Sequence, residues 1–295
     1  MALALRSSRV PRPVYEITAG RAHLRFYQGD CLDVLPALAP ESIGVVVTSP
    51  PYNLGIKYRS YRDDLPRTEY LNWTDRWLRA LRPVMAPNGS LFLNVGAKPT
   101  DPWIPLEVAQ VARRFFRLQN TIHWVKSIAI DRDAAGRGAL DRDVAVGHYK
   151  PINSDRFVND CHEFIFHFSP NGRTRLDRRA VGVPYQDASN VKRWAAAGQG
   201  LRCRGNTWFI PYETIQSRDR DRPHPASFPP KIPEQCIRLH GRARAGAVLD
   251  PFLGLGSSAI AAARLGLDFV GVELDAHYLD EAVARVKQAV DTTAG

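Results

Sequence analysis

A glycine-rich turn between a buried strand and a helix, close to the C-terminal end, constrains the fold of this chain most strongly. AGAVLDPF reads as a strand, Asp250-Pro251-Phe252-Leu253-Gly254-Leu255-Gly256 contains the turn, and residues 257–265 read as an Ala-rich helix. Glycines allow the backbone to turn tightly, and the first turn of the helix offers unpaired amides to a ligand. The next strand, DFVGVEL, carries Glu273, whose carboxylate can accept hydrogen bonds from two ribose hydroxyls. This unit indicates a site for a nucleoside-containing cofactor.

Only 22 residues follow Glu273, so the rest of the sheet must come from strands earlier in the chain. Apolar runs and helical spacing alternate along the sequence, which indicates an α/β sheet in a permuted order. Strands are expected at residues 22–30, 42–50, 90–96, 121–126 and 162–168. Helices are expected at residues 69–85, 106–116, 228–239 and 276–290, with a helical turn at 31–38.

A second motif, Thr48-Ser49-Pro50-Pro51-Tyr52-Asn53, follows the apolar Ile-Gly-Val-Val-Val run. Open α/β sheets bind their ligands at the carboxyl ends of such strands. Two prolines make a rigid corner that orients the carbonyl of Ser49 or Pro50 outward, and Tyr52 offers a flat ring. Taken alone, the motif is better explained as a proline-stiffened loop with Tyr52 in the core.

The net charge of +10 is concentrated in residues 171–222, which contain eleven basic and five acidic residues. Aromatic residues are interleaved there, namely Tyr185, Trp194, Trp208, Phe209 and Tyr212. Basic groups for phosphates and flat rings for bases suit a nucleic-acid surface. A solvated Arg-rich face whose aromatic rings belong to a local core is an equally good interpretation.

The chain divides into four parts on composition and pattern. Residues 1–21 are expected to be a basic tail, and 22–170 a catalytic part with a mobile loop at about 127–147. Residues 171–222 form the basic segment, and 223–295 the cofactor-binding part. The four cysteines include no C-x-x-C pair, and no apolar run approaches the ~20 residues of a membrane span. We therefore expect a soluble intracellular protein without a metal site.

Four segments together, TSPPYN, DPFLGLG, FVGVEL and HPASFP, resemble the S-adenosylmethionine-dependent DNA amino-methyltransferases. Their order, with the catalytic motif first and the cofactor motif last, is similar to that of the β class, from about Leu24 to Val290. The resemblance implies a Rossmann-like methyltransferase sheet with helices on both faces, a circularly permuted motif order and a small basic target-recognition region at 171–222.

The resemblance also implies roles for individual residues. The catalytic corner, Ser49, Pro50, Pro51 and Tyr52, would receive a base flipped out of duplex DNA. Tyr52 would stack on the base, and Ser49 and the Pro50 carbonyl would accept hydrogen bonds from its amino group. S-adenosylmethionine would contact Asp30, Asp250, Phe252, Gly254, Gly256, Glu273, His224 and Phe228. Contacts to DNA are expected from Lys150, Arg173, Arg175, Arg193, Arg202 and Arg204.

A serine at the first position of the corner is commoner in the N4-cytosine enzymes of this family, and an aspartate in the N6-adenine enzymes. Ser49 therefore favours N4-cytosine, with N6-adenine as the nearest alternative. The resemblance further implies a double-stranded DNA partner, a bacterial cytoplasmic or nucleoid location, a restriction–modification setting and room for a homodimer. It implies no metal.

Three other functions remain open from the sequence. The spacing Gly254, Gly256, Ala259 with Glu273 also fits an NAD-dependent oxidoreductase, which would have no affinity for DNA. A DNA-binding module without activity would keep the fold, although the catalytic corner is intact. Methylation of RNA or of a protein glutamine is favoured less by Ser49 and by the basic segment.

Overall fold

The computed structural model describes residues 11–56, 58–133, 140–147, 153–185, 200–211 and 228–294. In these ranges a sheet of nine strands has the order β1-β2-β13-β12-β3-β4-β8-β5-β11. Its strands are β1 (Tyr15–Ala19), β2 (Ala22–Gln28), β3 (Ile43–Thr48), β4 (Met85–Val95), β5 (Arg117–Val125), β8 (His162–Ser169), β11 (Thr207–Phe209), β12 (Ala247–Asp250) and β13 (Phe269–Glu273). Most adjacent pairs are parallel, while β1 and β8 run antiparallel to their neighbours.

The permuted order is visible at the centre of this sheet, where β12 pairs with β3 although the two strands are far apart in sequence. Leu249 lies opposite Val46 in this parallel pair. Asp250 at the end of β12 and Thr48 at the end of β3 consequently lie at the same edge. Such a junction is where open α/β sheets bind their ligands.

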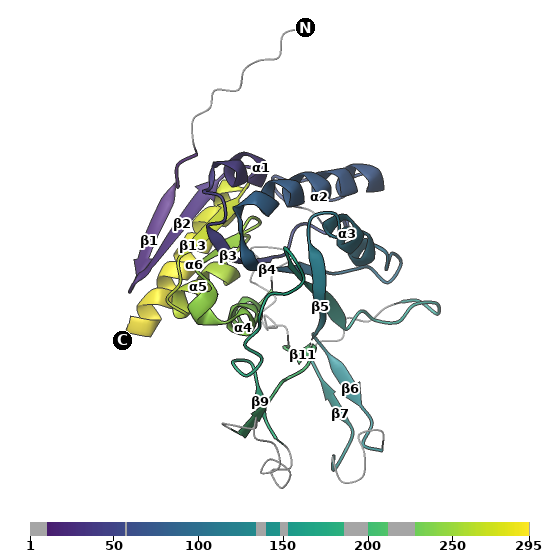
Figure 1. The fold of residues 1–295 in the computed structure, drawn as a ribbon. Coiled ribbons are helices and arrows are strands. Elements are labelled where there is room, and N and C mark those ends of the chain that lie inside the picture. Colours follow the sequence, from purple (N-terminus) through teal and green to yellow (C-terminus); the bar gives the residue numbers. More distant parts are fainter. Residues whose placement is uncertain are drawn as a thin grey trace.

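Helices cover both faces of the sheet (Figure 1). One face packs against α1 (Cys31–Val34), α2 (Arg67–Leu81) and α3 (Ile104–Ala112), and the other against α4 (Lys231–His240), α5 (Ser257–Arg264) and α6 (Ala276–Ala294). Successive strand residues point to opposite faces, so Val45 and Val47 join one core and Val46 the other. A strand covered on both faces must be apolar throughout, which explains the Val-Val-Val run. Within the described ranges, 3₁₀ turns lie at Leu35–Ala37, Arg82–Val84 and Arg242–Arg244.

The structure confirms the α/β fold and has strands in three segments where the sequence analysis expected none. Strand β1 lies within the range 1–21 that was expected to be a tail, because it pairs along its length with β2. The expected loop at 127–147 contains a hairpin of β6 (Ile128–Ile130) and β7 (Val144–Val146). Strand β11 lies within the basic range 171–222 but is part of the central sheet.

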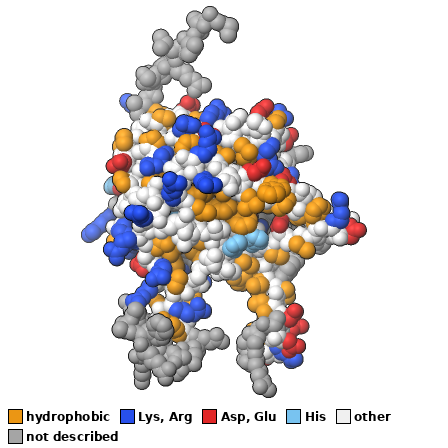
Figure 2. Space-filling model, turned by 45° about the vertical axis from the view of Figure 1, so that its right-hand side comes forward, with side chains coloured by type: hydrophobic (Ala, Val, Ile, Leu, Met, Phe, Trp, Pro, Cys, Tyr) orange, Lys and Arg blue, Asp and Glu red, His pale blue; other side chains and the backbone are white. Residues whose placement is uncertain are grey.

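Two projections extend from the same side of the molecule (Figures 1 and 2). One is the β6–β7 hairpin, and the other contains β9 (Val183–Pro184) paired with β10 (Leu201–Arg202). The hairpin carries exposed acidic side chains, and exposed Arg202 lies on the other projection. No helix among the described residues is long and apolar enough to cross a membrane.

Two buried histidines form a polar chain through the sheet. Asn120 contacts His167 Nδ1 at 2.9 Å, and His167 Nε2 lies 3.0 Å from Ser90 Oγ. Ser90 Oγ in turn lies 2.9 Å from His240 Nδ1. Burial, together with the nearby His240, lowers the pKa of His167 to about 3. The folded protein therefore holds His167 as the neutral imidazole.

We expect the buried, neutral His167 to make the folded protein less stable in mild acid. The folded pKa of His167 lies below the ordinary value of about 6.5, so the unfolded state takes up the proton first and stability is lost as pH falls below about 6.5. The expected loss is about 2 kcal/mol by pH 5. Urea unfolding of the wild type and of His167→Asn between pH 7.5 and 5 measures it. Parallel pH profiles for the two proteins would contradict the assignment.

Candidate active site

A cavity of about 190 Å³ lies at the carboxyl ends of β2, β3, β12 and β13. Both sequence motifs contribute to its wall, although 202 positions separate Thr48 from Asp250. The lining includes these predicted site residues: Asp30, Ser49, Pro50, Pro51, Tyr52, Phe228, Asp250, Phe252, Gly254 and Glu273. The structure therefore places the corner and the glycine turn around one shared cavity.

The corner after β3 is held by side chains from outside the motif. Tyr70 on α2 donates a hydrogen bond from its hydroxyl to the Pro51 carbonyl, 3.0 Å away. Buried Asp63 accepts the backbone N–H groups of Asn53, Leu54 and Ile56 at 2.8–3.0 Å. Asn53 has a positive φ of 60°, a conformation that asparagine tolerates better than most residues. These contacts fix the exit of the chain from the corner.

A polar network lies behind the corner, and the sequence analysis missed three of its members. Tyr52 Oη lies 2.5 Å from Ser49 Oγ, 2.6 Å from Asn94 Nδ2 and 3.1 Å from Glu163 Oε2. Asn94 Nδ2 also donates to Glu163 Oε2 at 2.7 Å, and Lys126 Nζ lies 3.0 Å from Glu163 Oε1. The sequence did contain a signal for these three residues, because Asn94, Lys126 and Glu163 are polar residues within or at the ends of apolar strands.

Asp250 links the corner to the glycine turn. Its buried carboxylate accepts hydrogen bonds from Thr48 Oγ1 at 2.7 Å and from Ser258 Oγ at 2.5 Å. The backbone N–H of Phe252 is a third donor, at 3.1 Å. Burial raises the pKa of Asp250 to about 6, and these three hydrogen bonds oppose that rise. The side chain expected to contact the cofactor thus fixes β3 against the start of α5.

Glu273 lies at the end of β13 and shapes the glycine turn from the other side. Its carboxylate accepts the backbone N–H of Gly254 at 2.8 Å and that of Asp275 at 3.0 Å. Burial is the main cause that raises the pKa of Glu273 to about 7. A buried carboxylate of this kind gains from any further hydrogen-bond donor that a ligand brings.

The two glycines of the turn have different surroundings. Gly254 lines the cavity with a φ of 52°, whereas Gly256 does not line it. Gly256 has a φ of 78°, and a Cβ there would lie 3.2 Å from the Cβ of Ala282 on α6. The structure therefore explains Gly256 by backbone conformation and close helix packing rather than by contact with the cavity.

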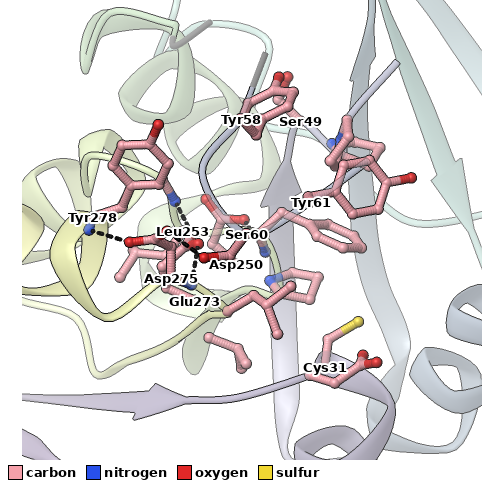
Figure 3. Close-up of a pocket in the computed structure, with 18 of the residues that line it drawn as sticks. Cys31, Ser49, Tyr58, Ser60, Tyr61, Asp250, Leu253, Glu273, Asp275 and Tyr278 are labelled. Atoms are coloured by element: carbon pink, nitrogen blue, oxygen red, sulfur yellow. Dashed lines mark hydrogen bonds between the residues drawn. The ribbon is translucent and has the colours of Figure 1, made fainter. Parts of the chain in front are cut away.

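The segment after the corner crosses to α6 and closes one side of the cavity. Ser60 Oγ donates to Asp275 Oδ2 at 2.5 Å, and Tyr58 and Tyr61 also line the cavity. Figure 3 shows Glu273, Asp275 and Tyr278 on one side of the cavity and Tyr61 on the other. The hydroxyl of Tyr61 is buried and has no hydrogen-bond partner within the described ranges. Sequence reasoning did not single out these residues.

Asp30, Phe252 and Phe228 also reach the cavity wall. Asp30 is the N-cap of α1 and accepts the backbone N–H of Leu32 at 2.9 Å. The Phe252 ring packs edge-on against Trp77 of α2, with the ring centroids 5.3 Å apart. The wall therefore combines carboxylates that accept hydrogen bonds, backbone amides that donate them and aromatic surface. This combination fits a nucleoside with a charged tail.

The predicted DNA contacts lie in different places. Exposed Arg173 and Arg175 follow β8 at the sheet edge opposite the cavity, because β8 runs antiparallel to its neighbours. Arg204 is half-buried and donates to the Val181 carbonyl at 3.1 Å. Trp208, for which the sequence left a nucleic-acid surface and a local core equally open, is 1% exposed and belongs to the core. Two further predicted DNA contacts, Lys150 and Arg193, lie outside the described residues, and so does His224, which was predicted to contact the cofactor.

No group of three or more His, Cys, Asp or Glu side chains in the described part of the chain is placed to hold a metal ion. The site is a cavity lined by the glycine turn after one strand, with its carboxylates, and by the Ser-Pro-Pro-Tyr corner after the neighbouring strand. A sequence model of the N6/N4 type described as DNA methylase matches residues 43–284. The chain belongs to this DNA methylase family.

Individual relatives agree with the family assignment. The chain is 27% identical to the type II methyltransferase M.BglII of Bacillus subtilis over 279 residues, covering 88% of this chain and 68% of that protein. It is 26% identical to M.ScaI of Streptomyces caespitosus, covering 94% and 84%.

Solved structures share the fold. The cytosine-N4-specific PvuII DNA methyltransferase matches with a TM-score of 0.62 and 19% identity over 95% of this chain and 94% of its own. A DNA modification methylase of Thermus thermophilus, TTHA0409, in complex with S-adenosyl-L-methionine, matches with a TM-score of 0.58 and 25% identity. That match covers 90% of this chain and 94% of TTHA0409.

Cofactor binding should weaken in acid through Glu273. The family resemblance implies that Glu273 accepts two ribose hydroxyls, and with a pKa of about 7 in the free protein its carboxyl would first have to lose its proton. The affinity for S-adenosylmethionine is expected to fall about 20-fold between pH 7.5 and 5.5. Calorimetry over this range measures it, with Glu273→Gln as the control. A variant with the same pH dependence as the wild type would exclude Glu273 as its source.

Proposed function

We propose that this protein is a site-specific DNA methyltransferase that methylates the exocyclic N4 amino group of a flipped cytosine in duplex DNA. The observation that carries the proposal is the shared cavity, whose wall contains both Tyr52 of the corner and Glu273 of the cofactor unit. A donor bound by Glu273 would have its transferable group directed toward a base stacked on Tyr52. Membership of the DNA methylase family supports the same reaction.

The methyl donor in this proposal is S-adenosylmethionine, which supplies a methyl group activated by a sulfonium. Glu273 would hold the ribose, Asp30 the adenine amino group, and the aromatic wall around Phe252 the adenine ring. The orphaned hydroxyl of Tyr61 is available as a further hydrogen-bonding group for the ligand. The complex of TTHA0409 with this compound supports the choice.

The corner would position the target amino group. Tyr52 stacks on the flipped base, while Ser49 Oγ and the Pro50 carbonyl accept hydrogen bonds from the amino group. These acceptors draw the nitrogen lone pair out of conjugation with the ring and direct it toward the methyl group. Positioning and electrostatic stabilisation then supply most of the rate, with no covalent intermediate.

Ser49 and the fold similarity to the N4-specific PvuII enzyme favour cytosine over adenine. N6-adenine methylation by the same corner is the second candidate, because the family contains both reactions. The duplex would lie on the side of the two projections, where Arg202 is exposed. We further propose a cytoplasmic location, a type II modification role and, as an assembly, a homodimer.

Nucleoside mass spectrometry after incubation with labelled cofactor and duplex DNA of mixed sequence tests the proposal. N4-methylcytosine is expected. N6-methyladenine without N4-methylcytosine would transfer the assignment to adenine, and the absence of both would refute DNA methylation. Thermal shift with S-adenosylmethionine and with NAD, run in parallel, separates this function from the oxidoreductase alternative.

A further inference from the structure

Glu163 does not line the cavity, yet it ends the polar network that begins at Ser49. It is the first acidic residue of β8, and its side chain is 13% exposed. The antiparallel direction of β8 brings the start of this strand to the edge where β3 and β4 end. A carboxylate on β8, 111 positions from Tyr52, is thereby hydrogen-bonded to the catalytic corner.

The donors and acceptors around Tyr52 can be assigned from their chemistry. An ionised carboxylate only accepts hydrogen bonds, and the amide nitrogen of Asn94 only donates them. Lys126 Nζ, 3.0 Å from Glu163 Oε1, favours the ionised carboxylate, which in turn directs Asn94 Nδ2 toward Glu163. Tyr52 has a single hydroxyl proton, and Glu163 Oε2 at 3.1 Å is the acceptor that attracts it.

This assignment fixes the direction of the hydrogen bond between the two hydroxyls. Tyr52 Oη uses its proton to donate a hydrogen bond to Glu163, so it must accept in its 2.5 Å contact with Ser49. Ser49 therefore donates its only proton toward Tyr52, away from the cavity. Asn94 Nδ2 makes a long contact of 3.5 Å to one lone pair of Ser49 Oγ, and the other lone pair is left to accept a proton donor in the cavity. A serine that turned its proton toward the cavity would repel an amino group.

We propose that Glu163 is a positioning residue that orients the chain Ser49→Tyr52→Glu163 and so makes Ser49 an acceptor for the amino group of the target base. The inference rests on the proposed function, because it concerns the same corner and the same amino group. Glu163 touches neither base nor cofactor in this scheme. Its effect reaches the reaction through Tyr52 and Ser49.

A double-mutant cycle tests this dependence. Glu163→Gln removes the charge that fixes the proton order while it keeps the size of the side chain. We expect the single-turnover methylation rate to fall about 30-fold, with cofactor affinity and melting temperature unchanged. In the background of Ser49→Ala the same change should cost less than about threefold, because the group on which Glu163 acts is absent.

Two further variants make the result specific. Glu234→Gln alters an acid of similar burial, 17% exposed and ion-paired with Arg238 on α4, and should leave the rate unchanged. Asn94→Asp combined with Glu163→Gln returns a carboxylate to the hydroxyl of Tyr52 and should restore part of the rate. Rescue also keeps the test informative if Ser49→Ala falls below detection.

The outcomes are distinct. Equal losses in the presence and absence of Ser49, no loss at all, or a loss that follows the melting temperature would each overturn the role of Glu163. A wild-type protein that methylates no DNA would refute the proposed function itself, and the inference with it. Activity in the wild type with additive mutants would leave the function standing and reject only the inference.

Discussion

Tyr52→Ala should reduce the single-turnover methylation rate at least about 100-fold, because it removes two contributions at once. The ring that would stack on the flipped base contributes about 1–3 kcal/mol, judged from alanine substitution at stacking sites. Its hydroxyl also joins Ser49 to Asn94 and Glu163 in the polar network. Rapid-quench assays with labelled cofactor and excess enzyme measure the effect.

Cofactor binding provides the internal control for Tyr52→Ala. The predicted ribose contact is on β13, at the far side of the cavity from the corner, so the dissociation constant for S-adenosylmethionine should change less than about threefold. Tyr52→Phe keeps the ring and loses the hydroxyl that links Ser49 to Glu163, so about the same 30-fold reduction is expected from it as from Glu163→Gln. Full activity in the alanine variant would rule out base stacking by Tyr52.

Asp250→Ala is expected to lower the free energy of unfolding by about 3 kcal/mol, because Thr48, Ser258 and the Phe252 amide lose their acceptor. Removing a carboxylate that is buried with a raised pKa offsets part of that cost. In a chain of this size the change corresponds to a decrease in melting temperature of roughly 6–10 °C. Scanning calorimetry without cofactor measures it.

The matched variant for this position is Asp250→Asn, which retains acceptors for Thr48 and Phe252 while its amide can donate to Ser258. A loss of about 1 kcal/mol is expected from it. Cofactor affinity should fall more in the alanine variant than in the asparagine variant, since alanine removes the hydrogen bonds that hold the end of β3 against the start of α5. If alanine and asparagine destabilise equally, the hydrogen bonds of Asp250 are not what stabilises this junction.

The main sheet and the cavity could be predicted from sequence for a physical reason. A strand buried on both faces must be apolar throughout, as in Val45, Val46 and Val47, and a tight turn at its carboxyl end needs glycine or proline. These local requirements leave a readable pattern. Short edge elements leave a weaker one, and β1 gains its stability from pairing with β2 rather than from its own composition.

The polar network could not be predicted in the same way. Asn94, Lys126 and Glu163 come from three strands or their ends, and their meeting depends on the antiparallel direction of β8, which no local pattern encodes. Trp208 was ambiguous for another reason, because an aromatic residue in a basic segment fits either a binding surface or a core. The pairing of β11 with β5 places this side chain in the core.

The segment that contains the β6–β7 hairpin leaves the sheet after β5 and returns to it at the start of β8, where the two ends are hydrogen-bonded to each other. Lys126 donates its backbone N–H to the Cys161 carbonyl at 2.7 Å, and its side chain pairs with Glu163 one strand away. The β6–β7 hairpin lies between these two points. Because its ends are held together there, we expect that its length and sequence can change without displacing Lys126 and Glu163. Related proteins could therefore differ in this appendage while the groups around Glu163 keep their positions.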